Sequence, residues 1–170
     1  MRKIVCINSL SNNKKNEENI NRTLIEGISI LDCYNSGFIT LSEKKILDRL
    51  YPSGKFHCWG AHDGRILSTT FSRIEEGDAV LGMNKDGANL IGYVIYKMTR
   101  KDSSFSKYLW GQESTWTNIF FITNIHNINV SKTKINEMLG FKDNYHLRKL
   151  IVKEVSKGDE IINYIEGRKN

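Results

Sequence analysis

The strongest pattern of apolar and polar positions lies between residues 56 and 83. It opens with a short alternation that carries Trp59 and continues through a segment with two glycines, which predicts a strand followed by a loop. Gly77-Asp78 precedes the apolar run 79–83, and this order predicts a turn before a buried strand, because Gly accepts positive φ and Asp bonds its own backbone. Trp59 is therefore expected at the mouth of a loop between two strands, where its ring would form a wall for a flat ligand.

Further strand signals lie on both sides of this segment. Asn84 to Gly87 predicts a tight hairpin turn, with Gly87 at the position that requires positive φ. The pattern over residues 145–155 fits either a strand or a helix. The other predicted strands are residues 2–7, 28–34, 90–98, 116–123 and 125–130.

Helices are predicted where apolar residues recur at helical spacing or where capping residues occur. Ser42 is the expected N-cap of a helix that runs through residue 50, stapled by Leu41 and Ile46. Ser131 is expected to cap a helix that Gly140 ends. The predicted helices are residues 20–28, 42–50, 101–109, 131–139 and 159–165, and a brief turn is expected at Phe71 and Ile74.

The number of strands, the hairpin turns and the peripheral helices predict an α+β domain built on a curved or barrel-like sheet. Strands do not alternate regularly with long helices, which argues against a Rossmann or TIM architecture. A chain of 170 residues with 39% apolar residues is long enough for one domain with a sizeable core.

The chain is basic, with a formal net charge of +6 and a pI of about 9.2. Residues 97–153 carry ten Lys and Arg against four acidic residues, which accounts for the whole excess. This balance favours a polyanionic partner, although a solvated basic face explains it equally well.

Cysteine use and hydropathy indicate the compartment. Cys6, Cys33 and Cys58 are odd in number and widely spaced, which is typical of reduced, structural thiols. No apolar run approaches the roughly 20 residues of a membrane helix, and the N-terminus has no signal-peptide pattern. A soluble, cytoplasmic protein without membrane contact is expected.

Motifs for catalysis or metal binding are absent from the sequence. His57, His62 and Asp63 crowd near Cys58, but a strand would point His57 and Cys58 to opposite faces. No HExxH, CxxC, GxSxG, Walker A or GxGxxG spacing occurs. No metal and no cofactor is therefore expected, and an enzyme has no specific motif in its favour.

Three tryptophans, Trp59, Trp110 and Trp116, lie at predicted junctions of loops and strands. A single tryptophan is most often a core residue. Three at strand ends in a basic chain raise a second interpretation, in which the rings stack on a nucleobase. Such stacking contributes about 1–3 kcal/mol per base.

The order of several short motifs resembles the PUA-like superfamily, specifically its EVE and YTH domains. The continuation of the chain resembles the N-terminal EVE-type modules of McrB-type, modification-dependent restriction proteins. The motifs are Trp59-Gly60, Phe71 with Ile74, Gly77-Asp78 before Val80-Leu81, Gly92-Tyr93-Val94, Leu109-Trp110-Gly111, Trp116 with 119–122, Ile128-Asn129-Val130 and Leu139-Gly140-Phe141.

This resemblance implies a PUA-like fold and a reader of modified bases. Residues 56–165 would form the base-reading domain, and residues 1–55 would form an N-terminal extension or subdomain of unknown role. Such domains hold a flipped or single-stranded modified base, typically N6-methyladenine or 5-methylcytosine, in an aromatic cage. The cage would consist of Trp59 and Trp110 on either side of the base, with Trp116 as a third member. The Ser-Thr pair that follows the first tryptophan in YTH domains is missing here.

The remaining roles are assigned by residue type. His62, Asp63 and Ser68 would read the edge of the base. Nucleic acid is the expected partner, with modified DNA favoured over RNA, and an AAA+ or nuclease partner of a restriction system is also implied. A nucleic-acid-modifying enzyme that uses His62 and Asp63 as acid and base stays as a third alternative. The expected phosphate-binding residues are Lys97, Arg100, Lys101, Lys107, Lys142, Arg148 and Lys149.

Overall fold

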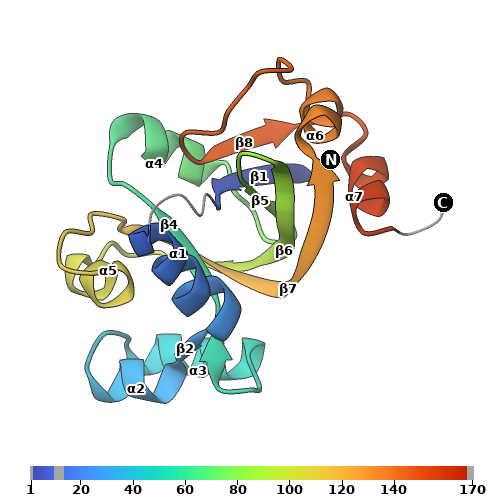
Figure 1. The fold of residues 1–170 in the computed structure, drawn as a ribbon. Helices are drawn as coiled ribbons and strands as arrows, with labels where there is room; N and C mark the ends of the chain where they lie inside the picture. The colour runs from blue at the N-terminus through green and yellow to red at the C-terminus, as the bar shows by residue number, and fades with distance from the viewer. Residues whose placement is uncertain (1, 10–13, 168–170) are drawn as a thin grey trace.

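A computed structural model describes residues 2–9 and 14–167 of the chain. Its strands are β1 (Lys3–Asn8), β2 (Ile28–Ser29), β3 (Lys55–Phe56), β4 (Cys58–Ala61), β5 (Ala79–Met83), β6 (Gly87–Lys97), β7 (Asn118–Ser131) and β8 (Ile151–Glu154). Six of them form one curled sheet in the order β4-β7-β6-β5-β1-β8, while β2 and β3 form a separate small sheet (Figure 1). Within the large sheet β1 and β5 run parallel and the other neighbours run antiparallel.

Short helices surround the large sheet, which confirms the predicted α+β class (Figure 1). α6 and α7 lie beside β7 at one end of the molecule, and α2 and α3 lie with the small sheet at the other. The helices are α1 (Lys14–Ile20), the π-helical turn η1 (Asn21–Glu26), α2 (Ile30–Asn35), α3 (Leu41–Leu50), α4 (Arg65–Ser72), α5 (Ser103–Trp110), α6 (Lys132–Leu139) and α7 (Gly158–Ile165).

The predicted hairpin between β5 and β6 is present. Gly87 has φ of +143°, and a Cβ built there would lie 2.0 Å from the carbonyl oxygen of Val130. Only glycine therefore fits this turn. The predicted helix after Ser131 is also present: the Ser131 hydroxyl accepts from the Lys134 amide, and Gly140 ends the helix in the left-handed conformation.

Two N-terminal predictions are wrong in detail. The predicted strand at 28–34 is only the two-residue β2, because the Ser29 hydroxyl accepts from the Asp32 amide and so caps α2. The predicted cap Ser42 lies inside α3. Thr40 caps this helix instead, in a capping box with Glu43.

The central and C-terminal segments also differ from prediction in places. The brief turn expected at Phe71 and Ile74 is present, since the Ile74 amide donates to the Phe71 carbonyl over 3.1 Å, but it lies at the end of a helix that was not predicted, α4. The two strands predicted on either side of Asn124 are a single bent strand, β7, in which Asn124 has φ of +52°. The ambiguous segment 145–155 forms β8, which is a strand.

The N-terminal segment contributes a central strand to the large sheet. β1 pairs with β5 on one side and with β8 on the other, and its residues Ile4 to Ile7 are fully buried. The expected boundary after residue 55 therefore does not separate β1 from the sheet formed by the later strands. The segment 28–56 contains the small sheet and the helices α2 and α3.

Three hydrophobic clusters stabilise the fold. One joins the sheet to α6 and α7, one lies around α2, α3 and α5, and one packs β1, β4, β5 and β7 against Ile74 and Leu24. Cys6, Cys33 and Cys58 are fully buried, and burial raises the pKa of the Cys6 and Cys33 thiols to about 12. None of the helices in the described ranges is long and apolar enough to cross a membrane.

Candidate functional site

A cavity of about 420 Å³ opens where the two edges of the curled sheet approach one another. β4 and β8 are the first and last strands in the order of the sheet; β4 lines the cavity on one side, and residues 148–150, directly before β8, line it on another. We call it the seam cavity, and its size suits a small, flat ligand. It is lined by Asn8, Asn16, Trp59, Gly60, Ala61, His62, Leu67, Trp116, Arg148, Lys149 and Leu150.

The three tryptophans form one cluster beside this cavity. The Trp116 ring centroid lies 5.3 Å from that of Trp59 and 5.4 Å from that of Trp110. Trp59 and Trp116 line the seam cavity, whereas Trp110 lies behind them. The predicted gathering of the three rings is therefore observed.

The predicted arrangement of Trp59 and Trp110 is not the observed one. Their centroids are 6.4 Å apart with an interplanar angle of 76°, so the two rings meet edge to face with no gap for a base. Both side chains are also buried, with 4% and 3% exposed. Trp116 is only half-buried, which makes Trp59 and Trp116 the aromatic wall that a ligand in the seam cavity would contact.

Gly60 allows the tryptophans to pack closely. A Cβ at this position would lie 2.7 Å from Cη2 of Trp110 and 3.2 Å from Cβ of Trp116. Any side chain on β4 here would displace one of the rings, because distances below 3.0 Å are not tolerated between carbon atoms. The close packing of the tryptophans thus depends on the glycine after Trp59.

A hydrogen bond fixes the orientation of Trp116. Its Nε1 donates to Nε2 of His62 over 3.0 Å, and Nδ1 of His62 lies 2.5 Å from Oγ1 of Thr115. An indole N–H can only donate, so Nε2 is the unprotonated nitrogen and Nδ1–H donates to Thr115. His62 is therefore a neutral imidazole with both nitrogens engaged.

His62 and Trp116 also separate the seam cavity from a second cavity of about 270 Å³. Both cavities are lined by these two residues and by Asn16, and Trp110 lines only the second. The hydrogen-bonded pair therefore lies between the two cavities.

Asp63 and Ser68 support the site and do not line the seam cavity. The Ser68 hydroxyl donates to the Asp63 carboxylate over 3.2 Å, and Nδ2 of Asn118 donates to Ser68 and to the His62 carbonyl. Lys101 forms an ion pair with Asp63, and this hydrogen bond holds the pKa of Asp63 below its ordinary value. Of the predicted polar residues, only His62 reaches the cavity.

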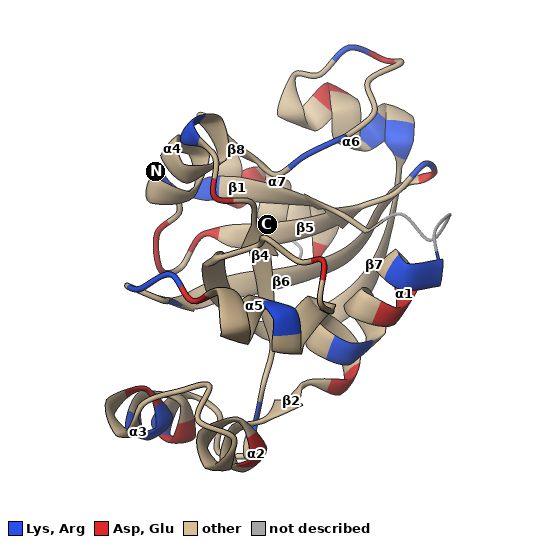
Figure 2. Cartoon of the chain, turned by 90° about the vertical axis from the view of Figure 1, so that its left-hand side faces the viewer, with Lys and Arg blue, Asp and Glu red and all other residues tan. Residues whose placement is uncertain are grey.

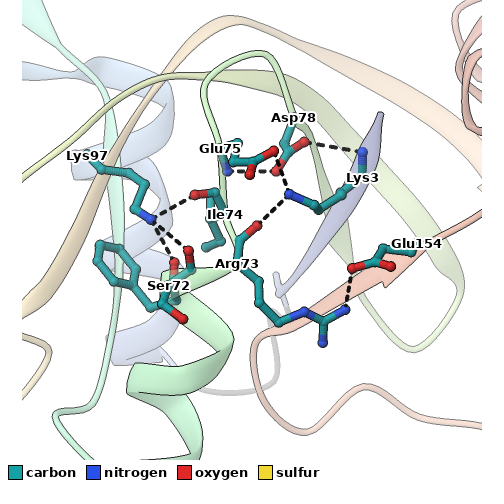
Figure 3. Close-up of polar contacts among 9 residues, drawn as sticks. Lys3, Ser72, Arg73, Ile74, Glu75, Asp78, Lys97 and Glu154 are labelled. Carbon is teal, nitrogen blue, oxygen red and sulfur yellow. Dashed lines mark hydrogen bonds and ion pairs between the residues drawn. The ribbon is translucent and has the colours of Figure 1, made fainter. Parts of the chain in front are cut away.

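Lys97 is held inside the chain and is not placed to bind phosphate. Its Nζ donates to the carbonyl oxygens of Phe71, Ser72 and Ile74, at 2.9, 3.4 and 2.7 Å, where α4 ends (Figure 3). Burial lowers the pKa of Lys97. The ammonium group therefore caps α4, which favours a cation at its C-terminal end.

Arg100 is likewise committed to internal contacts. Its guanidinium donates two hydrogen bonds to the Glu43 carboxylate, at 2.7 and 2.9 Å, and another to the Phe38 carbonyl. It also pairs with Asp102. These contacts join α3 to the start of α5, so Arg100 is a structural residue.

Four other predicted phosphate-binding residues lie at exposed positions. Arg148 and Lys149 line the seam cavity, while Lys107 lies on α5 and Lys142 follows α6. Basic residues also lie on α1, close to the cavity lining residue Asn16 (Figure 2). The cationic groups nearest the cavity are thus Arg148 and Lys149.

Several lining residues were not predicted. Asn8 and Asn16 belong to the N-terminal 55 residues, which the resemblance left outside the reader domain, and Leu67 belongs to the unexpected helix α4. Asn8 follows a predicted strand, and a polar residue at a strand end is the one signal that could have indicated it. Within residues 2–9 and 14–167, no three His, Cys, Asp or Glu side chains are grouped so that they could hold a metal ion.

Comparison with known proteins adds one solved structure. The chain is similar to the "N-terminal domain of Thermococcus gammatolerans McrB bound to m5C DNA", with a TM-score of 0.74 and 17% identity, over 99% of this chain and 100% of that chain. No protein-family model and no curated protein matches the sequence. At this identity the likeness shows a shared fold, and the matched domain is of the McrB N-terminal type that the short motifs resemble.

Proposed function

We propose that this protein is a nucleic-acid-binding module that receives a modified base of DNA in the seam cavity. The observation that carries this proposal is the composition of that cavity, with two indole rings on one wall and Arg148 and Lys149 beside it. Aromatic rings stack on any base, and cations hold the flanking phosphates. The solved structure with the similar fold is named for its complex with m5C DNA, which supports DNA over RNA.

The base would reach the cavity by leaving the duplex stack. Extrusion of a base costs a few kcal/mol, and stacking on the aromatic wall returns about 1–3 kcal/mol. A methyl group that contacts Trp59 or Trp116 loses hydration and adds about 1 kcal/mol of preference. A polar group left without a partner on the unmodified base would add further discrimination, and Asn8 and Asn16 are the amide side chains in the lining.

The contacts of His62 and Asp63 disfavour the alternative of a nucleic-acid-modifying enzyme. Both ring nitrogens of His62 are engaged by Trp116 and Thr115, and Asp63 is paired with Lys101. Neither side chain is poised to exchange a proton with a substrate. An AAA+ or nuclease partner stays a prediction.

The proposal is tested by measuring binding of Trp116→Ala to four probes: methylated duplex, unmethylated duplex, single-stranded DNA and RNA. We expect the wild type to prefer the methylated duplex and the variant to bind it about 10-fold more weakly, as the loss of one stacked base implies. Tyr164→Ala, which removes an aromatic ring that is 56% exposed on α7, is the matched control and should bind normally.

Equal, salt-sensitive binding of all four probes by the wild type would contradict the proposal, because it would leave only a basic surface. Preference for the RNA probe would favour the RNA-reading alternative. Thermal unfolding of each variant shows whether any loss of binding reflects loss of fold.

A further inference from the structure

The first turn of α4 presents an apolar side chain to solvent beside the seam cavity. Ile66 is 67% exposed, more than any other large hydrophobic residue in the described ranges. It belongs to none of the three hydrophobic clusters found there. Packing into the core of the described residues therefore does not account for an isoleucine at this position.

Ile66 is adjacent in the chain to a residue of the candidate site. The next residue, Leu67, lines the seam cavity, and the preceding residue, Arg65, is exposed. Arg148 and Lys149, which directly precede β8, line the same cavity as Leu67. An apolar side chain next to Arg65, near a cavity that Arg148 and Lys149 line, suits a base stack, which is apolar between two charged phosphate backbones.

α4 is held firmly enough to present this tip at a fixed place. Lys97 binds three carbonyl groups at its C-terminal end, and Lys3 donates to the Arg73 carbonyl over 3.0 Å (Figure 3). Arg73 in turn pairs with Glu154 of β8 at 2.9 Å. These contacts fasten the C-terminal end of α4 to β1, β6 and β8, and a supported element is what a positioned contact residue requires.

We propose that Ile66 acts as a wedge that enters the base stack of duplex DNA at the place vacated by the extruded base. This inference rests on the proposed function of the seam cavity. Apolar side chains inserted between base steps unstack and bend DNA, and an isoleucine is among the residues used in this way. The wedge would stabilise the open duplex while Arg65, Arg148 and Lys149 hold the backbone around it.

The test separates duplex binding from base binding. Ile66→Ala is measured against a duplex with one methylated base and against the same methylated strand without its complement, with Leu31→Ala as the matched control, since Leu31 is 56% exposed on α2. A single strand has no stack to invade. We therefore expect Ile66→Ala to weaken duplex binding about 10-fold and to leave single-strand binding within about twofold, while Leu31→Ala changes neither.

A fluorescent base analogue opposite or beside the target reports unstacking directly. Its emission should rise when the wild type binds the duplex, rise less with Ile66→Ala, and recover with Ile66→Leu. Equal losses on duplex and single strand, or no loss on the duplex, would overturn the wedge. Failure of the proposed function is a separate result, namely a wild type that does not distinguish methylated from unmethylated probes.

Discussion

At position 60 the backbone of β4 passes so close to the Trp110 ring and to Cβ of Trp116 that a side chain has no space. Gly60 has an ordinary φ, so its role is space and not backbone conformation. Gly60 lies between Trp59 and His62 along the chain, and both of these residues line the seam cavity. Adding a side chain at position 60 should therefore disturb the packing of the aromatic wall.

We predict that Gly60→Ser lowers the free energy of unfolding by about 1–3 kcal/mol, because the new Cβ overlaps the Trp110 ring and forces the cluster apart. Gly64→Ser is the matched control. A Cβ at position 64 meets nothing within 4 Å, and serine is a good N-cap for α4. Urea unfolding followed by tryptophan fluorescence measures both, and equal stability of the two variants would contradict the packing argument.

At the scale of single elements, the capping box at the start of α3 is the clearest local device. The Thr40 hydroxyl accepts from the Glu43 amide over 3.2 Å, and the Glu43 carboxylate accepts from the Thr40 amide over 2.7 Å. Burial raises the pKa of Glu43, but hydrogen bonds from Arg100 and Thr40 outweigh it and hold the pKa below its ordinary value. The carboxylate thus serves both the helix cap and the link to Arg100.

We predict that Thr40→Ala destabilises the protein by about 1 kcal/mol, because it leaves the Glu43 amide without its acceptor. Ser42→Ala should change stability by less than about 0.5 kcal/mol, since Ser42 lies exposed within the helix and caps nothing. The midpoints of urea unfolding, compared at equal slope, distinguish the two. A larger effect at Ser42 than at Thr40 would contradict the observed cap.

The elements that the sequence predicted correctly are those specified by neighbouring residues. The β5–β6 hairpin depends on the turn that ends at Gly87, and α6 on Ser131 and Gly140, so local chemistry was sufficient. α4 begins at Gly64 without a side-chain cap, and Lys97, far along the chain, holds its end. Such long-range contacts leave no local signal, which is why the turn at Phe71 and Ile74 was predicted without the helix that it ends.

The site was predicted in part for the same reason. Three tryptophans at the ends of elements indicated a shared aromatic site, and the structure brings them together. Their mutual packing depends on how β4 meets the end of α5, which no spacing in the sequence encodes. The function of the basic residues was equally hidden, because Lys97 and Arg100 look like any surface cation until their partners are known.

At the scale of the whole molecule, the curl of the sheet creates the site. The cavity lies between β4 and the segment directly before β8, and these two strands are at opposite ends of the strand order, so it forms only when the sheet brings these segments together. β1 joins β5 to β8, and its last residue, Asn8, lines the cavity. The N-terminal strand is therefore required for the base-binding site that we propose.

The chain has a net charge of +6, and its basic residues differ in role: some make contacts within the fold and others are exposed. Lys97, Arg100 and Lys101 are engaged by carbonyls and carboxylates within the fold, so they add little to the attraction of phosphate. Arg148 and Lys149 are exposed at the seam cavity. We expect these two residues to account for the part of DNA binding that responds most to salt.

We predict that the double variant Arg148→Gln/Lys149→Gln weakens duplex binding and reduces the slope of log K against log salt by about 1.8, since each phosphate contact contributes about 0.9. Lys45→Gln/Arg49→Gln on α3 removes the same formal charge from exposed positions away from the cavity and is the matched control. Its slope should stay close to that of the wild type. Counterion release from a localised contact depends on where the cations lie. Equal reductions of the salt slope in the two double variants would therefore show that DNA binding responds to total charge and not to a docking surface around the seam cavity.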